Sequence, residues 1–357
     1  MAIDIRTQEL LQKETDPAEL GIQWQNPGTE WGVRVAPGRR GLTLDEINVG
    51  SYGDVPEQSH NYTLRPRGAA PRADVGRIFK HWPEKSEVWS SSVAMLYEEA
   101  LTRQWSSASD IPWAELKPLS DDMELAMCQL CTFLTQVEFI AADVPGRWLD
   151  HISPDFYEVQ LFLGTQIMDE ARHMDVFRKR ALANGGGLMG AGAGAVAILG
   201  TQDFTEMTAI VHLVGEGFVQ SVFRMGEMIA PSEVEKRIFR LAAQDESRHV
   251  AFGVTHIKYV IETQPERREE IHHYLDQFEG LLGTSQASLT TNPATSSALS
   301  ILLGGGVDHI DEGRQKLLGI RKRQINEYMH RLEVIGLQER RVRMNPDLKV
   351  FLDPPRN

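Results

Sequence analysis

The sequence DEARH at residues 169–173 returns as DESRH at residues 245–249. Each copy contains Glu-x-x-His within a stretch of helical periodicity, and residues three positions apart lie on the same face of a helix. Each of the two helices therefore directs one carboxylate and one imidazole to the same side. A single Glu-x-x-His occurs often by chance, but two copies 76 residues apart, each with the same Asp before it and the same Arg within it, form a specific pattern.

That side of each helix is predicted to face a core. Apolar or small residues accompany the two motifs at helical spacing: Val159, Leu163, Ile167, Met174 and Phe177 in the first helix, and Phe239, Ala242, Val250 and Gly253 in the second. Burial of an isolated ionised carboxylate costs much free energy, so such a group normally loses its charge or stays in water. Two buried sites of this kind in one chain therefore indicate a compensating cation.

The surrounding sequence predicts an all-α fold built on a four-helix bundle. Four long helices are expected at 120–143, 155–183, 203–229 and 233–262, and sustained strand alternation is absent from the sequence. One helix is expected to precede them, from residue 87 to about 105. Three more are expected near 266–282, 284–303 and 307–336.

The chain is expected to divide into three parts. Residues 1–86, rich in Gly and Pro, predict an irregular N-terminal arm, in which Trp24 and Trp31 are expected to bury aromatic area. Residues 87–263 form the helical bundle, and residues 264–357 form accessory C-terminal helices and a tail. The glycine-rich segment 185–200 follows a helix rather than a strand, which favours a connector or lid over a phosphate-binding loop.

The other two helices of the bundle should supply carboxylates to the same centre. Glu138 is the only acidic residue in an apolar stripe of the first helix, and Glu216 occupies the equivalent place in the third. Glu216 and Glu246 also lie at nearly equal distances from the break at Ala230–Pro231, as partners in an antiparallel pair should. The alternatives are Glu124 in the first helix and Glu206 or Glu227 in the third.

The predicted ligand set is therefore Glu138, Glu170, His173, Glu216, Glu246 and His249. One Glu from each of two helices and Glu-x-x-His from each of the other two is the pattern of di-iron carboxylate bundles. Four carboxylates balance two divalent cations, and oxygen with imidazole ligands suits iron or manganese. Cys128 and Cys131 form a single CxxC inside a helix, which favours small core residues over a zinc site.

The net charge and the composition limit the kinds of partner and the location that we expect for the chain. The net charge is −13, and residues 86–263 account for most of it, with 25 acidic and 13 basic side chains. This balance argues against nucleic acid as a partner. The sequence contains no run of 18 apolar residues, so we expect no membrane span, and the N-terminal residues do not resemble a signal peptide. With only two cysteines, we expect a reducing, cytoplasmic location.

On the paired motifs, residues 120–260 resemble the ferritin-like di-iron carboxylate superfamily, in particular its oxygen-activating branch. The resemblance implies two iron ions, or one manganese and one iron, with O2 as co-substrate. It implies that Asp169 and Asp245 each accept a hydrogen bond from an imidazole of the opposite helix, and that Arg172 and Arg248 pair with these aspartates. For the arginines, a simple surface pair is the alternative.

The chain departs from the branches of this superfamily at three positions. Phe177 stands where tyrosyl-radical reductase subunits carry their tyrosine, Gln220 where monooxygenase hydroxylases often carry Thr, and Ala242 where arylamine oxygenases add a His. His212 lies four residues before Glu216 on the same face. It is expected to be an extra ligand, an outer group that supports the ligands, or a satisfied core histidine.

The expected activity is O2-dependent oxidation of a small or medium organic substrate, with hydroxylation, N-oxygenation and desaturation all open. The expected substrate pocket consists of Leu134, Phe177, Val219, Gln220 and Phe223. Electrons must come from a separate reductase or ferredoxin, because the sequence holds no flavin, iron–sulfur or nicotinamide motif, and a homodimer is expected. The alternatives are a ferroxidase or iron-storage protein, an oxidase resembling the ribonucleotide reductase small subunit, and a metal-free scaffold.

Overall fold

A computed structural model describes residues 5–12, 25, 28–71, 81–192, 196–283 and 293–354. The regular secondary structure of the described residues is helical, and their only β-pairing is an isolated bridge between Gly38 and Gly41. The α-helices are α1 (Ile5–Gln12), α2 (Leu44–Ile47), α3 (Lys85–Val88), α4 (Val93–Thr102), α5 (Asp121–Gly146), α6 (Tyr157–Ala183), α7 (Phe204–Thr208), α8 (Glu216–Ile229), α9 (Glu233–Thr263), α10 (Arg268–Gly283), α11 (Pro293–Gly304), α12 (Ile310–Ile335), α13 (Arg340–Arg343) and α14 (Pro346–Lys349).

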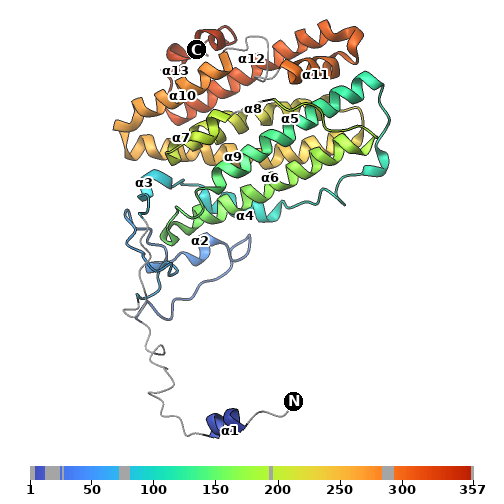
Figure 1. Cartoon of the computed structure of the whole chain (residues 1–357). Helices are drawn as coiled ribbons and strands as arrows, with labels where there is room; N and C mark the ends of the chain where they lie inside the picture. The colour runs from blue at the N-terminus through green and yellow to red at the C-terminus, as the bar shows by residue number, and fades with distance from the viewer. Residues whose placement is uncertain are drawn as a thin grey trace.

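The four long helices of the sequence prediction form the centre of the molecule (Figure 1). Helix α5 packs along α6, α8 packs along α9, and α6 also contacts α9. The prediction of an all-α, ferritin-like four-helix bundle is therefore confirmed. The contact between α6 and α9 matters most for the site, because these two helices carry the DEARH and DESRH segments.

Local sequence signals set the ends of the bundle helices. Helix α5 begins after Ser120, and its first turn holds Asp121, Asp122 and Glu124, whose negative charges suit the positive end of the helix dipole. The helix runs through Pro145 and ends at Gly146, where the sequence predicted the stop. Helix α9 begins after Ser232, whose hydroxyl accepts a hydrogen bond from the backbone N–H of Val234.

The third helix of the bundle is continuous but not uniformly α-helical. Between α7 and α8, residues Ala209–Gly215 form a π-helical segment that ends directly before Glu216. Such segments are rare and often occur at functional sites. Helix α9 crosses this segment closely, and a Cβ atom on Gly253 would lie only 2.8 Å from Cβ of His212. A larger residue at position 253 would therefore push the two helices apart.

The single helix predicted over residues 87–105 is wrong, since α3 and α4 are separated by residues 89–92. The hydroxyls of Ser90 and Ser92 lie 2.6 and 2.7 Å from Oγ1 of Thr255, and the carbonyl of Trp89 accepts a hydrogen bond from Nδ1 of His256. These contacts with α9 give the backbone and the serine hydroxyls hydrogen-bond partners that do not require a continuous helix. Local periodicity cannot reveal such long-range partners.

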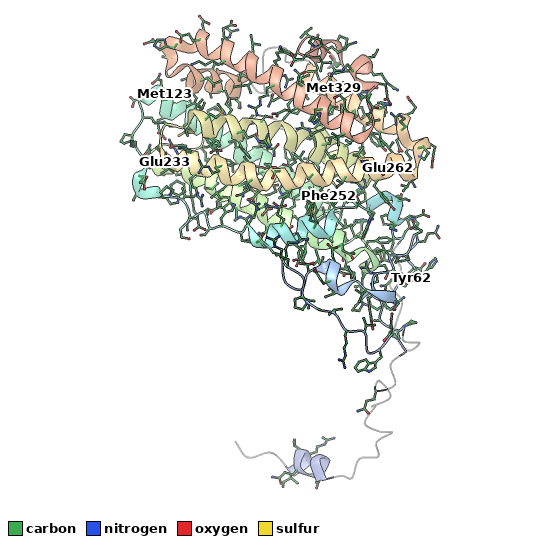
Figure 2. The ribbon with its side chains drawn as sticks, turned by 180° about the vertical axis from the view of Figure 1, so that it is seen from behind. Tyr62, Met123, Glu233, Phe252, Glu262 and Met329 are labelled. Carbon is green, nitrogen blue, oxygen red and sulfur yellow. The ribbon has the colours of Figure 1, made fainter. Side chains whose placement is uncertain are left out.

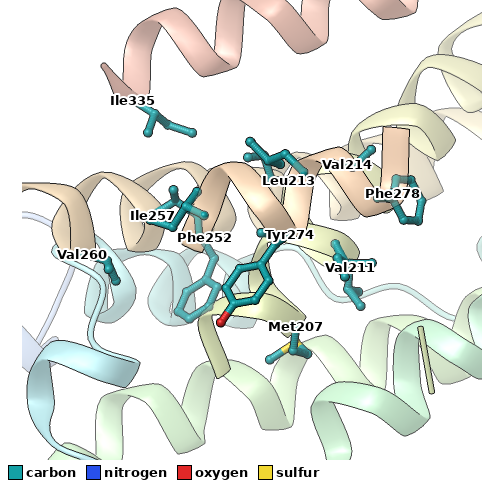
Figure 3. Packing of buried hydrophobic residues seen from close by; sticks show 14 of the residues in the cluster. Met207, Val211, Leu213, Val214, Phe252, Ile257, Val260, Tyr274, Phe278 and Ile335 are labelled. Carbon is teal, nitrogen blue, oxygen red and sulfur yellow. The ribbon is translucent and has the colours of Figure 1, made fainter. Parts of the chain in front are cut away.

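Among the C-terminal helices, α12 packs on α8 and α9, whereas α11 packs on α12 and α5 (Figure 1). Helix α10 and helix α12 are confirmed, the latter preceded by a single 3₁₀ turn at Val307–His309. Helix α11 begins at Pro293, and the predicted residues 284–292 before it lie outside the described residues. Figure 3 shows apolar side chains of this region, among them Phe252, Tyr274 and Ile335, in one buried cluster. Bundle and C-terminal helices therefore share a core.

The described part of the N-terminal arm is held against the start of α6. Arg67 forms a buried ion pair with Glu158, and Ser59 and Asn61 both donate hydrogen bonds to the carboxylate of Asp155. The expectation that Trp31 buries its ring is wrong, because that side chain is 85% exposed. Trp24 lies outside the described residues. The division at residues 86 and 263 stays a prediction.

By length and composition alone, helix α5 could cross a membrane. It nevertheless lies in the bundle, and 56% of its most apolar window is buried inside the protein. The buried core helix of a bundle meets the same criterion, so this feature adds no evidence for a membrane span.

Candidate metal centre

The structure brings all six predicted ligands together in the middle of the bundle. One group consists of Glu138, Glu170, His173 and Glu246, and the second of Glu170, Glu216, Glu246 and His249. Within each group the candidate ligand atoms lie within 4.8 Å of one another. All six side chains are buried. Because two glutamates belong to both groups, the cluster has the form of two adjacent metal sites with shared carboxylates.

Both imidazoles turn the same ring atom toward the carboxylates. Nδ1 of His173 lies 3.3 Å from oxygens of both Glu170 and Glu246 and 4.0 Å from Glu138. Nδ1 of His249 lies 3.0 Å from Glu170, 3.2 Å from Glu246 and 3.8 Å from Glu216. The two Nδ1 atoms therefore face the cluster as potential ligand atoms.

Several of these atoms are buried and lack any hydrogen-bond partner. They are Oε1 of Glu138, both carboxylate oxygens of Glu170, Nδ1 of His173 and Oε1 of Glu246. Buried polar atoms without partners are costly, and native proteins leave few of them. Four carboxylates and two imidazoles fit two divalent cations of the iron or manganese type. The residues of the centre thus fit a dinuclear metal site, which would satisfy these atoms.

Without a cation, the carboxylates disfavour one another's charge. Burial together with the charges of Glu170 and Glu246 raises the pKa of Glu138 well above its usual range. Burial together with Glu216 raises the pKa of Glu246 to about 7. Such shifts arise when like charges share a site from which water is excluded. A bound cation would reverse this effect, because it favours the ionised carboxylates.

The aspartate of each motif contacts the histidine of the other motif, on the opposite helix. Asp245 of α9 lies 3.3 Å from Nε2 of His173 on α6, and Asp169 of α6 lies 3.3 Å from Nε2 of His249 on α9. A hydrogen bond from Nε2–H to a carboxylate leaves the Nδ1 lone pair directed at the cluster. The structure therefore places each aspartate where the resemblance implied, beside the imidazole of the opposite helix.

The two arginines join both aspartates into one buried network. Arg172 pairs with Asp169 and lies 3.2 Å from Asp245, while Arg248 lies 2.8 Å from Asp169 and 2.6 Å from Asp245. Both guanidinium groups are buried, so the alternative of a simple surface pair is wrong. Burial raises the pKa of Asp245, but its hydrogen bond to His173 and the positive charges of His173 and Arg248 outweigh this effect, so that the pKa lies below its usual range.

Sequence reasoning missed Trp105, which is part of this network. Its indole Nε1–H donates to Asp245 over 2.7 Å, its ring stacks on that of His173 at 6.3 Å, and the guanidinium of Arg172 lies 5.3 Å from its ring centre. Trp105 follows α4 and has no motif around it. No local sequence signal connects it with a residue 140 positions away.

His212 and Gln166 form a second supporting chain. Nε2–H of His212 donates to Oε1 of Gln166 over 2.8 Å, and the amide of Gln166 donates to Glu216 over 3.4 Å. The structure therefore places His212 one residue removed from the ligands, and burial lowers its pKa well below the usual value. Gln166 was missed, although it lies four residues before Glu170 on the same helix face, a spacing that could have revealed it.

Four of the five predicted pocket residues belong to one apolar cluster, which reaches His173 through Phe223. Leu134, Phe177 and Phe223 are buried, the rings of Phe177 and Phe223 lie 5.3 Å apart, and Phe223 lies edge-on to His173. Val219 packs against the same cluster. Gln220 differs, because it lines a groove between α8, α9 and α12.

The alternative carboxylates all have other partners. Glu124 accepts hydrogen bonds from Arg180 and Asn184, Glu206 accepts one from the backbone N–H of Gln202, and Glu227 pairs with Arg240. The two cysteines are buried and free, as expected for core residues, and burial raises the pKa of Cys131 to about 12. The described part of the glycine-rich connector lies alongside α5. Gln129 and Gln136 of α5 donate hydrogen bonds to its backbone carbonyls at Gly190 and Gly192.

No family model matches this chain, and none of the curated proteins matches it. Similar solved structures include R2-like ligand-binding oxidase with aerobically reconstituted Mn/Fe cofactor, at 16% identity and a TM-score of 0.46, covering 71% of this chain and 93% of that one. Two single-residue variants of R2-like ligand-binding oxidase with anaerobically reconstituted Mn/Fe cofactor are also similar. One has 20% identity, a TM-score of 0.47 and coverage of 70% and 95%, and the other 19%, 0.48 and coverage of 72% and 99%. What the centre does is therefore inferred from its own side chains.

Proposed function

We propose that this protein is a dinuclear-metal oxidase or oxygenase that uses O2 to oxidise a small or medium organic substrate. The observation that carries the proposal is the convergence of six side chains on one buried cluster in which several candidate ligand atoms lack a hydrogen-bond partner. The six residues are Glu138, Glu170, His173, Glu216, Glu246 and His249. One Glu from each of two helices and Glu-x-x-His from each of two others is the ligand pattern of di-iron carboxylate bundles.

The proposed metal pair is two irons, or one manganese and one iron, and when bound it would supply the reduction of O2. Glu170 and Glu246 would contact both ions, since each belongs to both ligand groups, whereas Glu138 and Glu216 would each serve one. Asp169 and Asp245 hold the imidazole tautomers through Nε2. These hydrogen bonds keep the Nδ1 atoms oriented and make the imidazoles better ligands.

Apolar side chains form one side of the surroundings of the centre. Leu134, Phe177 and Phe223 are buried in one apolar cluster, and Phe223 lies edge-on to His173, so an organic group at this side of the centre would meet apolar surface. A dry site protects reactive species from water and strengthens the electrostatic effects of its charged groups. Phe177 has no hydroxyl, so this position cannot store a tyrosyl radical, which favours substrate oxidation over a reductase-type radical function.

The electrons for O2 reduction are proposed to come from a separate reductase or ferredoxin. Arg172, which belongs to the buried network around the centre, donates a hydrogen bond to the exposed side chain of Gln104. Homodimer formation, a cytoplasmic location and the absence of a nucleic-acid or membrane partner stay predictions. Size-exclusion chromatography with light scattering would test the first of these.

Metal analysis tests the centre itself. We expect about two iron ions, or one manganese and one iron, per chain. In a Glu170→Ala variant the metal content should fall sharply, because this residue contributes to both groups. Glu233→Ala is the matched control, since Glu233 is an exposed residue of α9 that pairs with Lys236. Equal metal content in the two variants would contradict the ligand assignment.

Oxygen consumption tests the reaction. An oxidase or oxygenase should consume O2 in proportion to an added organic compound and a reductant, with a fixed metal content. A ferroxidase or iron-storage protein should instead consume O2 in proportion to added ferrous iron and accumulate many irons per chain. A panel of hydrocarbons, amines and acyl compounds, with product analysis by mass spectrometry, would separate hydroxylation, N-oxygenation and desaturation. O2 uptake that follows only iron would overturn the proposal.

A further inference from the structure

A groove of about 670 Å³ lies on the side of the bundle away from α5 and α6, between α8, α9 and α12. In Figure 2, α9 runs across the front between Glu233 and Glu262, and α12, marked by Met329, lies above it. The residues that matter for its chemistry are Gln220 and Arg224 of α8, Val250 and Val254 of α9, and Lys322 and Arg331 of α12. The metal centre does not need this groove, and nothing in the proposed reaction explains it.

The groove is positively charged in a chain that is negative overall. Its lining contains four cationic side chains, Arg224, Lys322, Arg323 and Arg331, and two carboxylates, Glu327 and Asp353. The carboxylates already have partners. Asp353 lies 2.7 Å from Lys322, and Glu327 lies 2.8 Å from Arg323 and 3.9 Å from Arg224. Two positive charges of the lining therefore remain without a compensating carboxylate, although the net charge of the chain is −13.

Arg331 is the cation that lacks a partner. Its Nε and Nη2 atoms are buried and receive no hydrogen-bond acceptor. Glu327, one turn away on α12, accepts hydrogen bonds from Arg323 and from the hydroxyl of Ser221. Burial lowers the pKa of Arg331 to about 10, so the group is still charged at neutral pH. An arginine in this state is normally paired with a carboxylate or phosphate, for which its planar fork is suited.

The backbone of α8 makes room for this guanidinium. It lies so close to Gly217 that a Cβ atom at that position would collide with Nη2. The opposite wall is apolar and comes from Val250, Ala251 and Val254 of α9. The Nε and Nη2 edge of the guanidinium thus lies against α8, while the positive charge of Arg331 borders the groove beside an apolar strip. This combination suits a ligand that has an anionic end and a hydrocarbon part.

We propose that this groove binds an organic oxyanion, with a carboxylate or phosphate group on the guanidinium of Arg331 and its carbon skeleton on Val250, Ala251 and Val254. The site is separate from the metal ligands, but its floor is formed by the helices that carry Glu216, Glu246 and His249. Ser247 and Val250 of the lining directly follow the ligands Glu246 and His249 in the sequence. The proposal does not depend on the metal content of the centre.

Isothermal titration calorimetry of the full chain at low ionic strength tests the site. The probes are inorganic phosphate, acetate and hexanoate, each titrated into protein before and after loading with iron. We expect saturable binding of one anion per chain in both preparations. Arg331→Met should weaken binding about tenfold or more, because a charge-assisted contact is lost. Arg331→Lys keeps the charge and the stem but not the fork, and should weaken binding by a smaller factor.

Arg314→Met is the matched control, because Arg314 is an exposed arginine of the same helix that lies outside the groove and pairs loosely with Asp311. Its affinity should equal that of the parent chain. Tighter binding of hexanoate than of acetate would identify a carboxylate with an apolar chain, and tighter binding of phosphate than of both would identify a phosphate ester. Circular dichroism verifies the fold of each variant, and Arg331→Lys serves if Arg331→Met fails to fold. Equal affinity in the Arg331 variants and the control, or absence of saturable binding by all three anions, would overturn the proposal.

Discussion

Asp245 of α9 and His173 of α6 lie 3.3 Å apart, carboxylate to Nε2, and the reverse pair of Asp169 and His249 lies at the same distance. Each Glu-x-x-His helix therefore orients the imidazole of the other. The two motifs are not independent sites that happen to be neighbours, because each half contains the group that fixes the ligand of the other half. Mutation of either aspartate should therefore weaken the binding of the metal ion that the histidine of the opposite helix contacts.

Asp245→Asn should weaken metal binding about 10- to 100-fold, the range found when the partner of a ligating histidine is removed. The asparagine keeps the shape but loses the charge that holds Nε2–H of His173 and the guanidinium of Arg248. Competition with a chelator of known affinity measures the effect. Asp175→Asn is the control, since Asp175 is a half-exposed acid on α6 that pairs with Lys179. Equal affinities in the two variants would exclude a role for Asp245 at the centre.

The arrangement of the carboxylates predicts that the number of metal ions lost on mutation depends on which glutamate is replaced. Glu138 belongs only to the group around His173, and Glu216 only to the group around His249. Glu138→Ala and Glu216→Ala should therefore each retain about one metal ion per chain, and the double variant about none. Metal analysis after desalting gives the stoichiometry, and iron spectroscopy shows whether the retained ion differs between the two single variants. Complete loss in both would mean that the two ions cannot bind separately.

Sequence reasoning found the six cluster residues because each lies within a helix, where a carboxylate in an apolar stripe is visible at steps of three and four. The place of Glu138 on α5 and of Glu216 on α8 followed from that local period. The π-helical segment before Glu216 did not prevent this, since it leaves His212 and Glu216 buried in the same bundle.

Residues that reach the centre from elsewhere in the chain could not be found in this way. Trp105 meets Asp245 only because α4 packs on α6 and α9, and no spacing rule applies across that distance. The break between α3 and α4 has the same origin, because the serines there bond to Thr255. Tertiary hydrogen bonds overrode a helical pattern in one case and added an unforeseen partner in the other.

Gln166 is expected to be a positioning residue for Glu216. Gln166→Leu removes an amide that bonds to both His212 and Glu216, and leaves the buried imidazole without an acceptor. Stability should fall by about 1–3 kcal/mol, the usual penalty for an unsatisfied buried polar group. Urea unfolding of the metal-free protein measures this, and metal affinity should fall as well. Gln277→Leu on the exposed face of α10 is the control, and an equal effect there would remove the special role of Gln166.

His256 should make the stability of the bundle depend on pH. Burial lowers the pKa of His256 to about 4, while Nδ1–H donates to the carbonyl of Trp89 over 2.8 Å and Nε2 lies 3.1 Å from the hydroxyl of Thr205. The unfolded chain binds a proton at this residue below its ordinary pKa of about 6.5, and the folded chain does not until about pH 4. The contribution is therefore fully present above pH 6.5 and decreases as the pH falls through this window.

The size of the effect follows from proton linkage, and amounts to about 2 kcal/mol lost between pH 7 and pH 5 from this residue alone. His256→Gln keeps an amide that can bond to both neighbours but cannot take up a proton in this range. Urea unfolding at several pH values should therefore give the variant a flatter dependence than the parent chain by that amount. His330→Gln is the control, because His330 is an exposed residue of α12 that lies near Glu333 and not in the bundle core. If the parent chain and His256→Gln have parallel pH profiles, His256 takes up its proton equally in the folded and unfolded states, contrary to its burial against Trp89 and Thr205.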